Sequence, residues 1–165
     1  YRLLSKTLPT IPLHIGVTEA GTLFQGLIKS ASGLGILLEQ GIGDTLRISL
    51  TDDPVEEVRA CWMLLSALGL RRRDPELVSC PTCGRCQVDL ISIAKEVEDR
   101  LKEIHRPLQV AVMGCVVNGP GEAADADIGV ACGKGSGLIF THGKTLRKVE
   151  EAAIVDVLME EIGRL

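Results

Sequence analysis

The sequence predicts an α/β region followed by a small α+β module. Two strand candidates begin at residues 13 and 45, and each precedes a helix-length apolar pattern, as in a repeated strand–helix unit. Strands joined by a helical crossover run parallel, so we expect a parallel pair. The later part of the chain instead carries several short strand patterns, a hairpin signal and a cysteine-rich loop.

Helical signals are clear in the first region. Residues 1–8 are typical of the last turns of a helix, and residues 23–38 repeat apolar side chains at helical spacing until Gly41 ends the pattern. Asp53 is expected to cap the next helix, with Pro54 in its first turn. We expect the buried stripe of that helix to consist of Val55, Val58, Trp62, Leu65 and Leu68.

Both strands of this region alternate between apolar and polar side chains. The strand at 45–50 places Arg47 and Ser49 on the face opposite its apolar side chains. Thr18 and Glu19 follow the first strand, at the strand end where α/β folds bind ligands. A charged group on a partly enclosed face needs a partner. Arg47 therefore either meets a bound anion or pairs with an internal carboxylate such as Glu19, and the pattern leaves both interpretations open.

The second module follows the basic run Arg71–Arg73, which we interpret as a solvated hinge. We expect strands at residues 77–79, 108–113 and 128–131. The helix between the first two strands is predicted to bury Leu90, Ile91, Ala94, Val97, Leu101 and Ile104. His142 and Gly143 mark a hairpin turn, and a last helix follows with an apolar stripe.

The sequence has 6 cysteines and no recognisable secretory signal, so we expect reduced, cytoplasmic thiols that bind metal. Three of them fall in the loop Cys80–Cys86 before a helix, and Cys115 follows another strand in a Gly-rich loop. Four thiols from two strand ends can close a zinc site or hold an iron–sulfur cluster. The triple C-x2-C-x2-C spacing favours iron–sulfur without deciding the question. Cys61 is typical of an unliganded core thiol, and the role of Cys132 stays open.

Composition excludes several classes of protein. A net charge of −4 and 2% aromatic residues provide neither the field nor the stacking surface for binding nucleic acid. The sequence contains no run of about 18 apolar residues, the length that a membrane-spanning helix needs. A hydrophobic content of 45% excludes disorder. The chain starts at Tyr1 rather than Met, and we expect it to be the C-terminal part of a longer protein.

Four segments resemble the hydroxymethylbutenyl diphosphate synthase family, the iron–sulfur enzymes of the methylerythritol phosphate route to isoprenoids. They are Leu13–Gly21, Gly43–Leu50, Cys80–Cys83 and Gly114–Glu122, and the similarity covers essentially the whole chain. The resemblance implies that residues 1–74 are the last two βα units of a TIM-type barrel and that residues 75–165 form an α+β iron–sulfur domain.

The resemblance also implies a reaction, a cofactor and partners. The family reductively opens 2-C-methyl-D-erythritol 2,4-cyclodiphosphate to 4-hydroxy-3-methylbut-2-enyl diphosphate, with two electrons that pass from ferredoxin or flavodoxin through a 4Fe–4S cluster. Family members are homodimers in which the cluster domain of one chain covers the barrel of the other. Because most of the barrel lies outside residues 1–74, we expect the fragment alone to be inactive.

Site residues carry over by motif. The implied cluster ligands are Cys80, Cys83, Cys115 and Glu122. The implied substrate-binding residues are Thr18, Arg47, Ser49 and Asn118, with Glu19 as the acid for the leaving hydroxyl. Cys86 departs from the family pattern: its spacing makes it a ligand candidate, whereas the resemblance gives the fourth position to Glu122. A carboxylate is a harder and more weakly held ligand for a soft site than a thiolate, which suits an exchangeable position.

A second class of function stays in view. The module could be an electron carrier or a structural domain that holds zinc or an iron–sulfur cluster without any substrate. The inward polar face of the 45–50 strand favours the enzyme, because a carrier has no need of Arg47 and Ser49 there.

Overall fold

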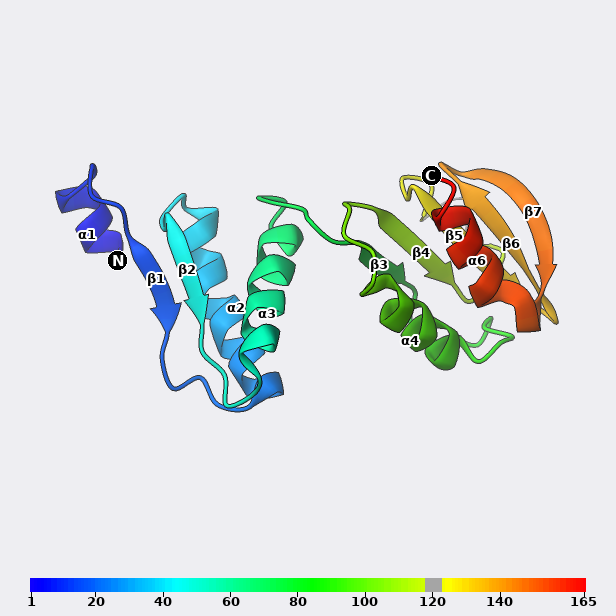
Figure 1. The fold of residues 1–165 in the computed structure, drawn as a ribbon, viewed down its shortest axis with the longest axis horizontal. Helices are drawn as coiled ribbons and strands as arrows, with labels where there is room; N and C mark the ends of the chain where they lie inside the picture. Colours follow the sequence, from blue (N-terminus) through cyan, green and yellow to red (C-terminus); the bar gives the residue numbers. More distant parts are fainter. Residues whose placement is uncertain (118–122) are drawn as a thin grey trace. The chain divides into compact units, whose positions relative to one another are not determined.

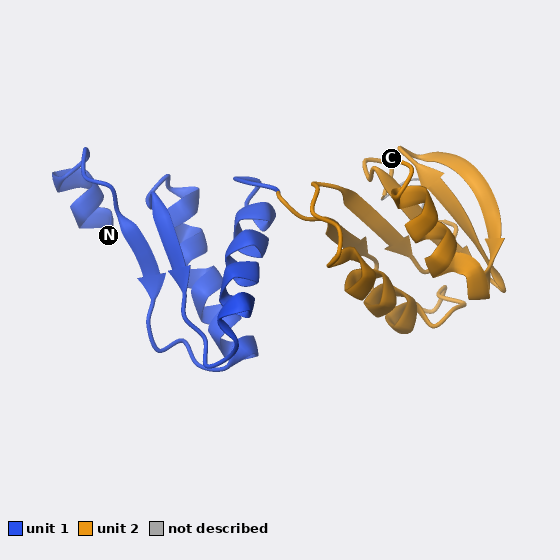
Figure 2. Cartoon of the chain, in the orientation of Figure 1, with its two compact units in different colours: residues 1–72 blue, residues 73–165 orange. Residues whose placement is uncertain are grey.

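The computed structural model describes residues 1–117 and 123–165. The chain forms two compact units, Tyr1–Arg72 and Arg73–Leu165 (Figure 2). Within the described ranges, no helix is both long enough and apolar enough to cross a membrane.

The first unit is a pair of parallel strands with their crossover helices (Figure 1). Its elements are α1 (Arg2–Thr7), β1 (His14–Val17), α2 (Leu23–Glu39), β2 (Thr45–Ile48) and α3 (Pro54–Ala67). Ile15 lies opposite Leu46, and Gly16 lies opposite Arg47. This confirms the parallel pair that the repeated strand–helix pattern predicts.

Local signals set the element ends in this unit. The Asp53 carboxylate accepts a hydrogen bond from the Val55 N–H at 2.9 Å and caps α3, as predicted. Gly41 has a φ of 70°, a left-handed conformation that ends α2 at little steric cost. The Asp44 carboxylate accepts from the Leu13 N–H at 2.7 Å and joins the starts of the two strands.

The core of the first unit lies between the strands and the two longer helices. Ile15, Ile48, Leu34 and Leu38 are buried in it, and Leu46 packs against them.

The predicted buried stripe of α3 is wrong at its start, because Val55 and Val58 are each 55% exposed. The Glu57 carboxylate accepts from the Leu50 N–H at 2.8 Å, and the small Ala60 is buried against the core. These contacts turn Glu57 and Ala60 toward β2 and the two valines outward. Leu65 and Leu68 pack in the core as predicted.

The second unit is a five-stranded sheet with two helices (Figure 1). Its elements are β3 (Glu76–Ser79), α4 (Leu90–Leu101), β4 (Gln109–Met113), β5 (Ile128–Gly133), β6 (Ser136–Thr141), β7 (Lys144–Glu150), the 3-10 turn η1 (Glu151–Ala153) and α6 (Ile154–Ile162). The strands lie in the order β3-β4-β5-β6-β7; β3, β4 and β5 are parallel, and β6 and β7 are antiparallel additions. The predicted hairpin turn is confirmed, since His142 and Gly143 have φ values of 44° and 73°.

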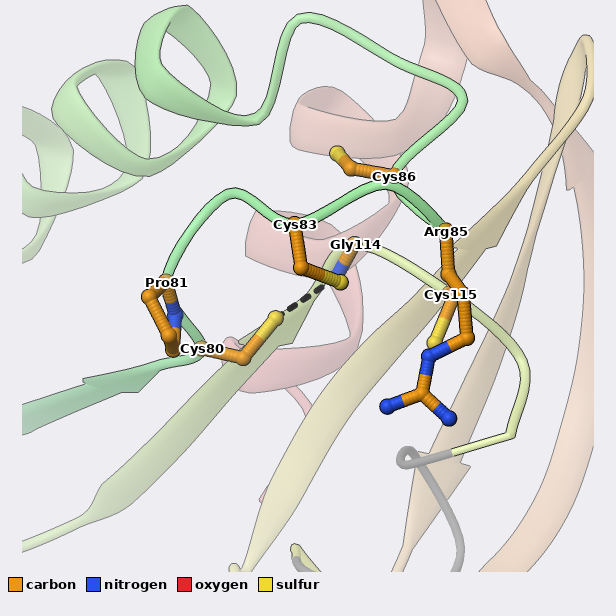
Figure 3. Close-up of a pocket in the computed structure, with 7 residues that line it drawn as sticks. All are labelled: Cys80, Pro81, Cys83, Arg85, Cys86, Gly114 and Cys115. Atoms are coloured by element: carbon orange, nitrogen blue, oxygen red, sulfur yellow. Dashed lines mark hydrogen bonds between the residues drawn. The ribbon is translucent and has the colours of Figure 1, made fainter.

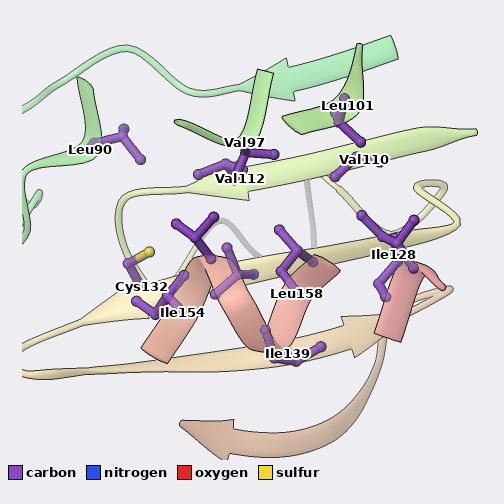
Figure 4. Packing of buried hydrophobic residues seen from close by; sticks show 13 residues of the cluster. Leu90, Val97, Leu101, Val110, Val112, Ile128, Cys132, Ile139, Ile154 and Leu158 are labelled. Carbon is purple, nitrogen blue, oxygen red and sulfur yellow. The ribbon is translucent and has the colours of Figure 1, made fainter. Parts of the chain in front are cut away.

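Both helices of this unit pack on one face of the sheet. Figure 4 shows Val97 and Leu101 of α4, with Ile154 and Leu158 of α6, against the strand side chains. The prediction that Ile91 is buried is wrong, because its side chain is 56% exposed. The stripe that faces the sheet contains Leu90, Ile93, Val97 and Leu101, and Ile91 lies off this row.

Residues 123–126, which lead into β5, pack on the opposite face of the sheet. Ala123 and Ala126 of this segment pack on Ala111 and Ala131, small residues that permit a close approach. The Asp127 carboxylate accepts from the Gln109 N–H at 2.8 Å and fixes the residues that lead into β5.

The loops that follow β3 and β4 leave the sheet at the same edge, because these two strands are parallel neighbours.

Candidate functional site

The cysteine-bearing loops meet at the carboxyl ends of β3 and β4. Cys80 directly follows β3, and Cys115 lies two residues beyond β4. Ser79 pairs with Val112, so the two loops start side by side. The Gly114 N–H donates a hydrogen bond to the Sγ of Cys80 at 3.2 Å, drawn as the dashed line in Figure 3. The backbone of one loop is thus held against a thiol of the other.

The thiols of these loops surround one pocket of about 220 Å³. It is lined by Cys80, Pro81, Cys83, Arg85, Cys86, Gly114 and Cys115. Figure 3 shows the Cys80 sulfur directed toward the Gly114 N, with the side chain of Cys83 beside this contact. Cys115 is buried and Cys83 is exposed, so the pocket has an inner wall and an open side.

The donor set of this pocket suits a soft metal group. As the side chains lie, no three His, Cys, Asp or Glu groups among the described residues are placed to hold a single metal ion. The lining nevertheless offers four thiols from two loops. Thiolates are the ligands of iron–sulfur clusters and of structural zinc, so the residues present fit either group.

Cys86 lies differently from the other thiols of the pocket. Its Sγ donates a hydrogen bond to the Val88 carbonyl at 3.3 Å. In Figure 3 its sulfur points away from those of Cys80 and Cys83. A Cβ at position 114 would lie 2.8 Å from this sulfur, so only glycine fits at Gly114 without a shift.

The exposed thiol of Cys83 is polarised by its neighbour. Arg85 donates to it from the backbone N–H and also from the side chain, and these bonds lower the pKa of Cys83. Thiolate character is what a metal ligand requires.

The two remaining cysteines are core thiols. Cys132 is fully buried, and burial, followed by the influence of Cys86, Glu151 and Cys80, raises its pKa to about 12. Cys61 packs in the core of the first unit, and burial raises its pKa. The core position expected for Cys61 is confirmed.

A second group of predicted site residues lies at the strand ends of the first unit. Arg47 is exposed on the polar face of β2. Its side chain lies over Gly16 of β1: a Cβ built on Gly16 would be 3.4 Å from the Arg47 Nε. Leu46 and Ile48 face the helices instead. The predicted alternation is therefore confirmed for Leu46, Arg47 and Ile48; β2 ends at Ile48, so the position predicted for Ser49 on this face stays a prediction. Among the ion pairs of the described residues, none joins Arg47 to Glu19.

The segments that follow β1 and β2 are joined at the carboxyl edge of this pair. Thr18 and Glu19 are exposed just beyond β1, and Glu19 has a left-handed φ of 56°. The Thr51 N–H donates to the Gly21 carbonyl at 3.0 Å. Ser49 directly follows β2, so it leaves the parallel pair at the same edge as Thr18 and Glu19. Their roles toward a substrate stay predictions.

The structure adds two residues to the site that the sequence analysis did not identify, and two predicted site residues lie outside the part of the chain that it describes. Asn118 and Glu122 lie outside the described residues. Arg85 and Gly114 were missed, although an arginine two positions after a candidate ligand and a glycine directly before another were visible in the sequence.

Two protein-family models match this chain. Residues 1–62 match the family model described as the GcpE TIM-barrel domain. Residues 76–164 match the model described as the GcpE protein C-terminal domain. The predicted fold class, a TIM-type barrel region followed by a second domain, is confirmed.

Curated relatives match along the chain as well. The chain is 61% identical over 165 residues to the 4-hydroxy-3-methylbut-2-en-1-yl diphosphate synthase (flavodoxin) of Geobacter sulfurreducens, covering 100% of this chain and 46% of that protein. Proteins of the same name from Lawsonia intracellularis and Clostridium acetobutylicum are 58% and 57% identical, covering 100% of this chain and 46% and 47% of their own lengths. The chain thus spans about half the length of the curated relatives it matches.

Proposed function

Because this chain belongs to the GcpE family, we propose that it takes part in the reductive ring opening of 2-C-methyl-D-erythritol 2,4-cyclodiphosphate to 4-hydroxy-3-methylbut-2-enyl diphosphate. The observation that carries the proposal is the convergence of the thiols of Cys80, Cys83 and Cys115 on one pocket. Relatives named for the synthase of this product, which match over the whole chain, support it.

The proposed cofactor is a 4Fe–4S cluster held by Cys80, Cys83, Cys115 and Glu122. Three of these ligands are soft thiols that line the pocket. The carboxylate would be the most weakly held of the four, which leaves one position exchangeable. The bound cluster would supply the two electrons of the reaction one at a time.

The polar strand ends of the first unit are proposed to bind the substrate. The Arg47 guanidinium offers several N–H donors in a planar fork, a geometry that suits diphosphate oxygens. Its exposed position over Gly16 leaves it open to such a ligand. Thr18 and Ser49 would donate hydroxyl hydrogen bonds at the same edge, and Asn118 is proposed to contact the substrate from the cluster domain.

Glu19 is proposed as the acid of the reaction. Ring opening takes up two electrons and releases one hydroxyl, which needs a proton to leave as water. A carboxyl group just beyond β1, at the strand end where this class of fold binds ligands, can donate that proton.

Two partners are part of the proposal. The names of the relatives specify flavodoxin, which supports flavodoxin as the electron donor for this chain. A homodimer in which the cluster domain of one chain covers the barrel of the other would bring Glu19 to the cluster of its partner.

One observation favours a second candidate, an electron carrier or structural module without substrate chemistry. Cys86 lines the same pocket as the other three thiols, and four thiolates could close a cluster or a zinc site. The hydrogen bond from Cys86 to the Val88 carbonyl favours the first candidate, because it directs the thiol away from the other sulfurs.

The test is anaerobic reconstitution of the complete protein with iron and sulfide, followed by assay with the cyclodiphosphate and a one-electron reductant. Formation of 4-hydroxy-3-methylbut-2-enyl diphosphate, dependent on the cluster, is the expected result. A reconstituted protein that takes up electrons but leaves the cyclodiphosphate intact would support the carrier instead.

A further inference from the structure

Arg85 brings a fixed positive charge to the thiol pocket. It lies two residues after Cys83, in the turn between β3 and α4, and its side chain lines the pocket. Figure 3 shows it on the same side of the pocket as Cys115. Among the described lining residues, Arg85 alone carries a formal charge. A guanidinium keeps its proton at any pH that a folded protein experiences.

Arg85 lies close to two proposed ligands. It follows Cys83 by two residues in the same turn, and it lines the pocket together with Cys83 and Cys115 (Figure 3). The guanidinium charge is therefore near the sulfurs that would hold the cluster.

We infer that Arg85 raises the reduction potential of the cluster through its charge at the thiol pocket. This inference rests on the proposed function, since it takes Cys83 and Cys115 as cluster ligands. Reduction adds one electron to the cluster and makes it more negative. A nearby cation stabilises the reduced form relative to the oxidised one.

The test is a redox titration of the reconstituted complete protein, with dithionite as the electron source and the EPR signal of the reduced cluster as the readout. In Arg85→Gln, we expect the equilibrium constant for reduction to fall roughly threefold to tenfold. A tenfold fall corresponds to a potential lower by about 59 mV for a one-electron couple.

Lys144→Gln is the matched control, because it removes the same charge from the same unit. Lys144 is exposed at the start of β7, after the hairpin turn. Because β6 ends beside the start of β5, this turn lies at the edge of the sheet opposite to Cys115. The reduction potential of the cluster in Lys144→Gln should equal that in the unchanged protein.

The outcomes are separable. An unchanged potential in Arg85→Gln would overturn the inference and leave the proposed cluster intact. Failure of the unchanged protein to bind a cluster would overturn the proposed function itself. If Arg85→Gln does not assemble a cluster, Arg85→Met is titrated in its place and a lower potential is again expected. Loss of the cluster in both variants, with full recovery in Arg85→Lys, would assign Arg85 to assembly and contradict a role in the potential.

Discussion

The Gly114 N–H donates a hydrogen bond to the Sγ of Cys80, 3.2 Å away, so the loop after β4 is tied to the loop after β3 through a proposed ligand atom. The contact depends on a backbone without a side chain at position 114. An added Cβ would lie 2.8 Å from the Cys86 Sγ and 3.0 Å from the Leu90 Cδ2. The two loops that carry the thiols are therefore packed as one unit.

Gly114→Ala should loosen this packing. Because the new methyl group forces Cys86 or Leu90 to move, we expect a loss of about 1–3 kcal/mol of unfolding free energy, the usual cost of overpacking. Urea unfolding measures this loss, and the iron content after reconstitution should fall with it. Gly84→Ala is the control in the neighbouring loop, since its added Cβ would meet no atom of the described residues within 4 Å beyond its own chain neighbours. Equal stabilities of the two variants would argue against the packing described.

Cys83→Ser and Cys86→Ser should differ sharply. We expect Cys83→Ser to lose most of the iron, because a hydroxyl is a poor ligand for a cluster. Cys86→Ser should keep nearly all of it, because a serine hydroxyl can still donate to the Val88 carbonyl. Iron and sulfide analysis after anaerobic reconstitution compares them. Loss of iron in Cys86→Ser alone would reassign the fourth ligand position.

Glu122→Ala should separate cluster assembly from turnover. Three thiolates are expected to hold most of the cluster, so its visible absorption should be largely retained. Turnover of the cyclodiphosphate should fall to a small fraction, because the fourth iron, where the substrate would bind, no longer has its protein ligand. Full activity in this variant would show that Glu122 is not the fourth ligand.

Gly16→Ala should act on the substrate through Arg47. An added Cβ would lie 3.2 Å from the Arg47 carbonyl oxygen, so the backbone at Arg47 must give by a few tenths of an ångström, whereas its distance of 3.4 Å from the Arg47 Nε is an ordinary contact. We expect KM for the cyclodiphosphate to rise severalfold, with a smaller change in kcat, because Arg47 is displaced and the substrate is bound less well. Gly35→Ala in α2 has open space around its Cβ and is the control. An unchanged KM in Gly16→Ala would contradict this link between the strand contact and substrate binding.

Much of the fold was predictable because its signals are local. Asp53 caps α3 and His142 with Gly143 forms the hairpin turn, and each needs only its own backbone neighbours. The buried face of α3 was not predictable from helical spacing, because it depends on the contact of Glu57 with the Leu50 N–H, which lies outside the helix, just after β2.

The same distinction holds for the site. The meeting of Cys80 and Cys115 followed from their places after two strands that proved to be parallel neighbours. The direction of the Cys86 thiol and the place of Arg85 at the pocket depend on the path of the turn, which spacing does not specify.

The thiol pocket is proposed to hold an iron–sulfur cluster, and the visible absorption of the anaerobically reconstituted complete protein tests this most directly, with Cys115→Ser measured beside it. We expect a broad visible band that bleaches on reduction. The band should be lost in Cys115→Ser, because Cys115 forms the buried wall of the pocket. A colourless protein that binds zinc, or a band that persists unchanged in Cys115→Ser, would contradict it.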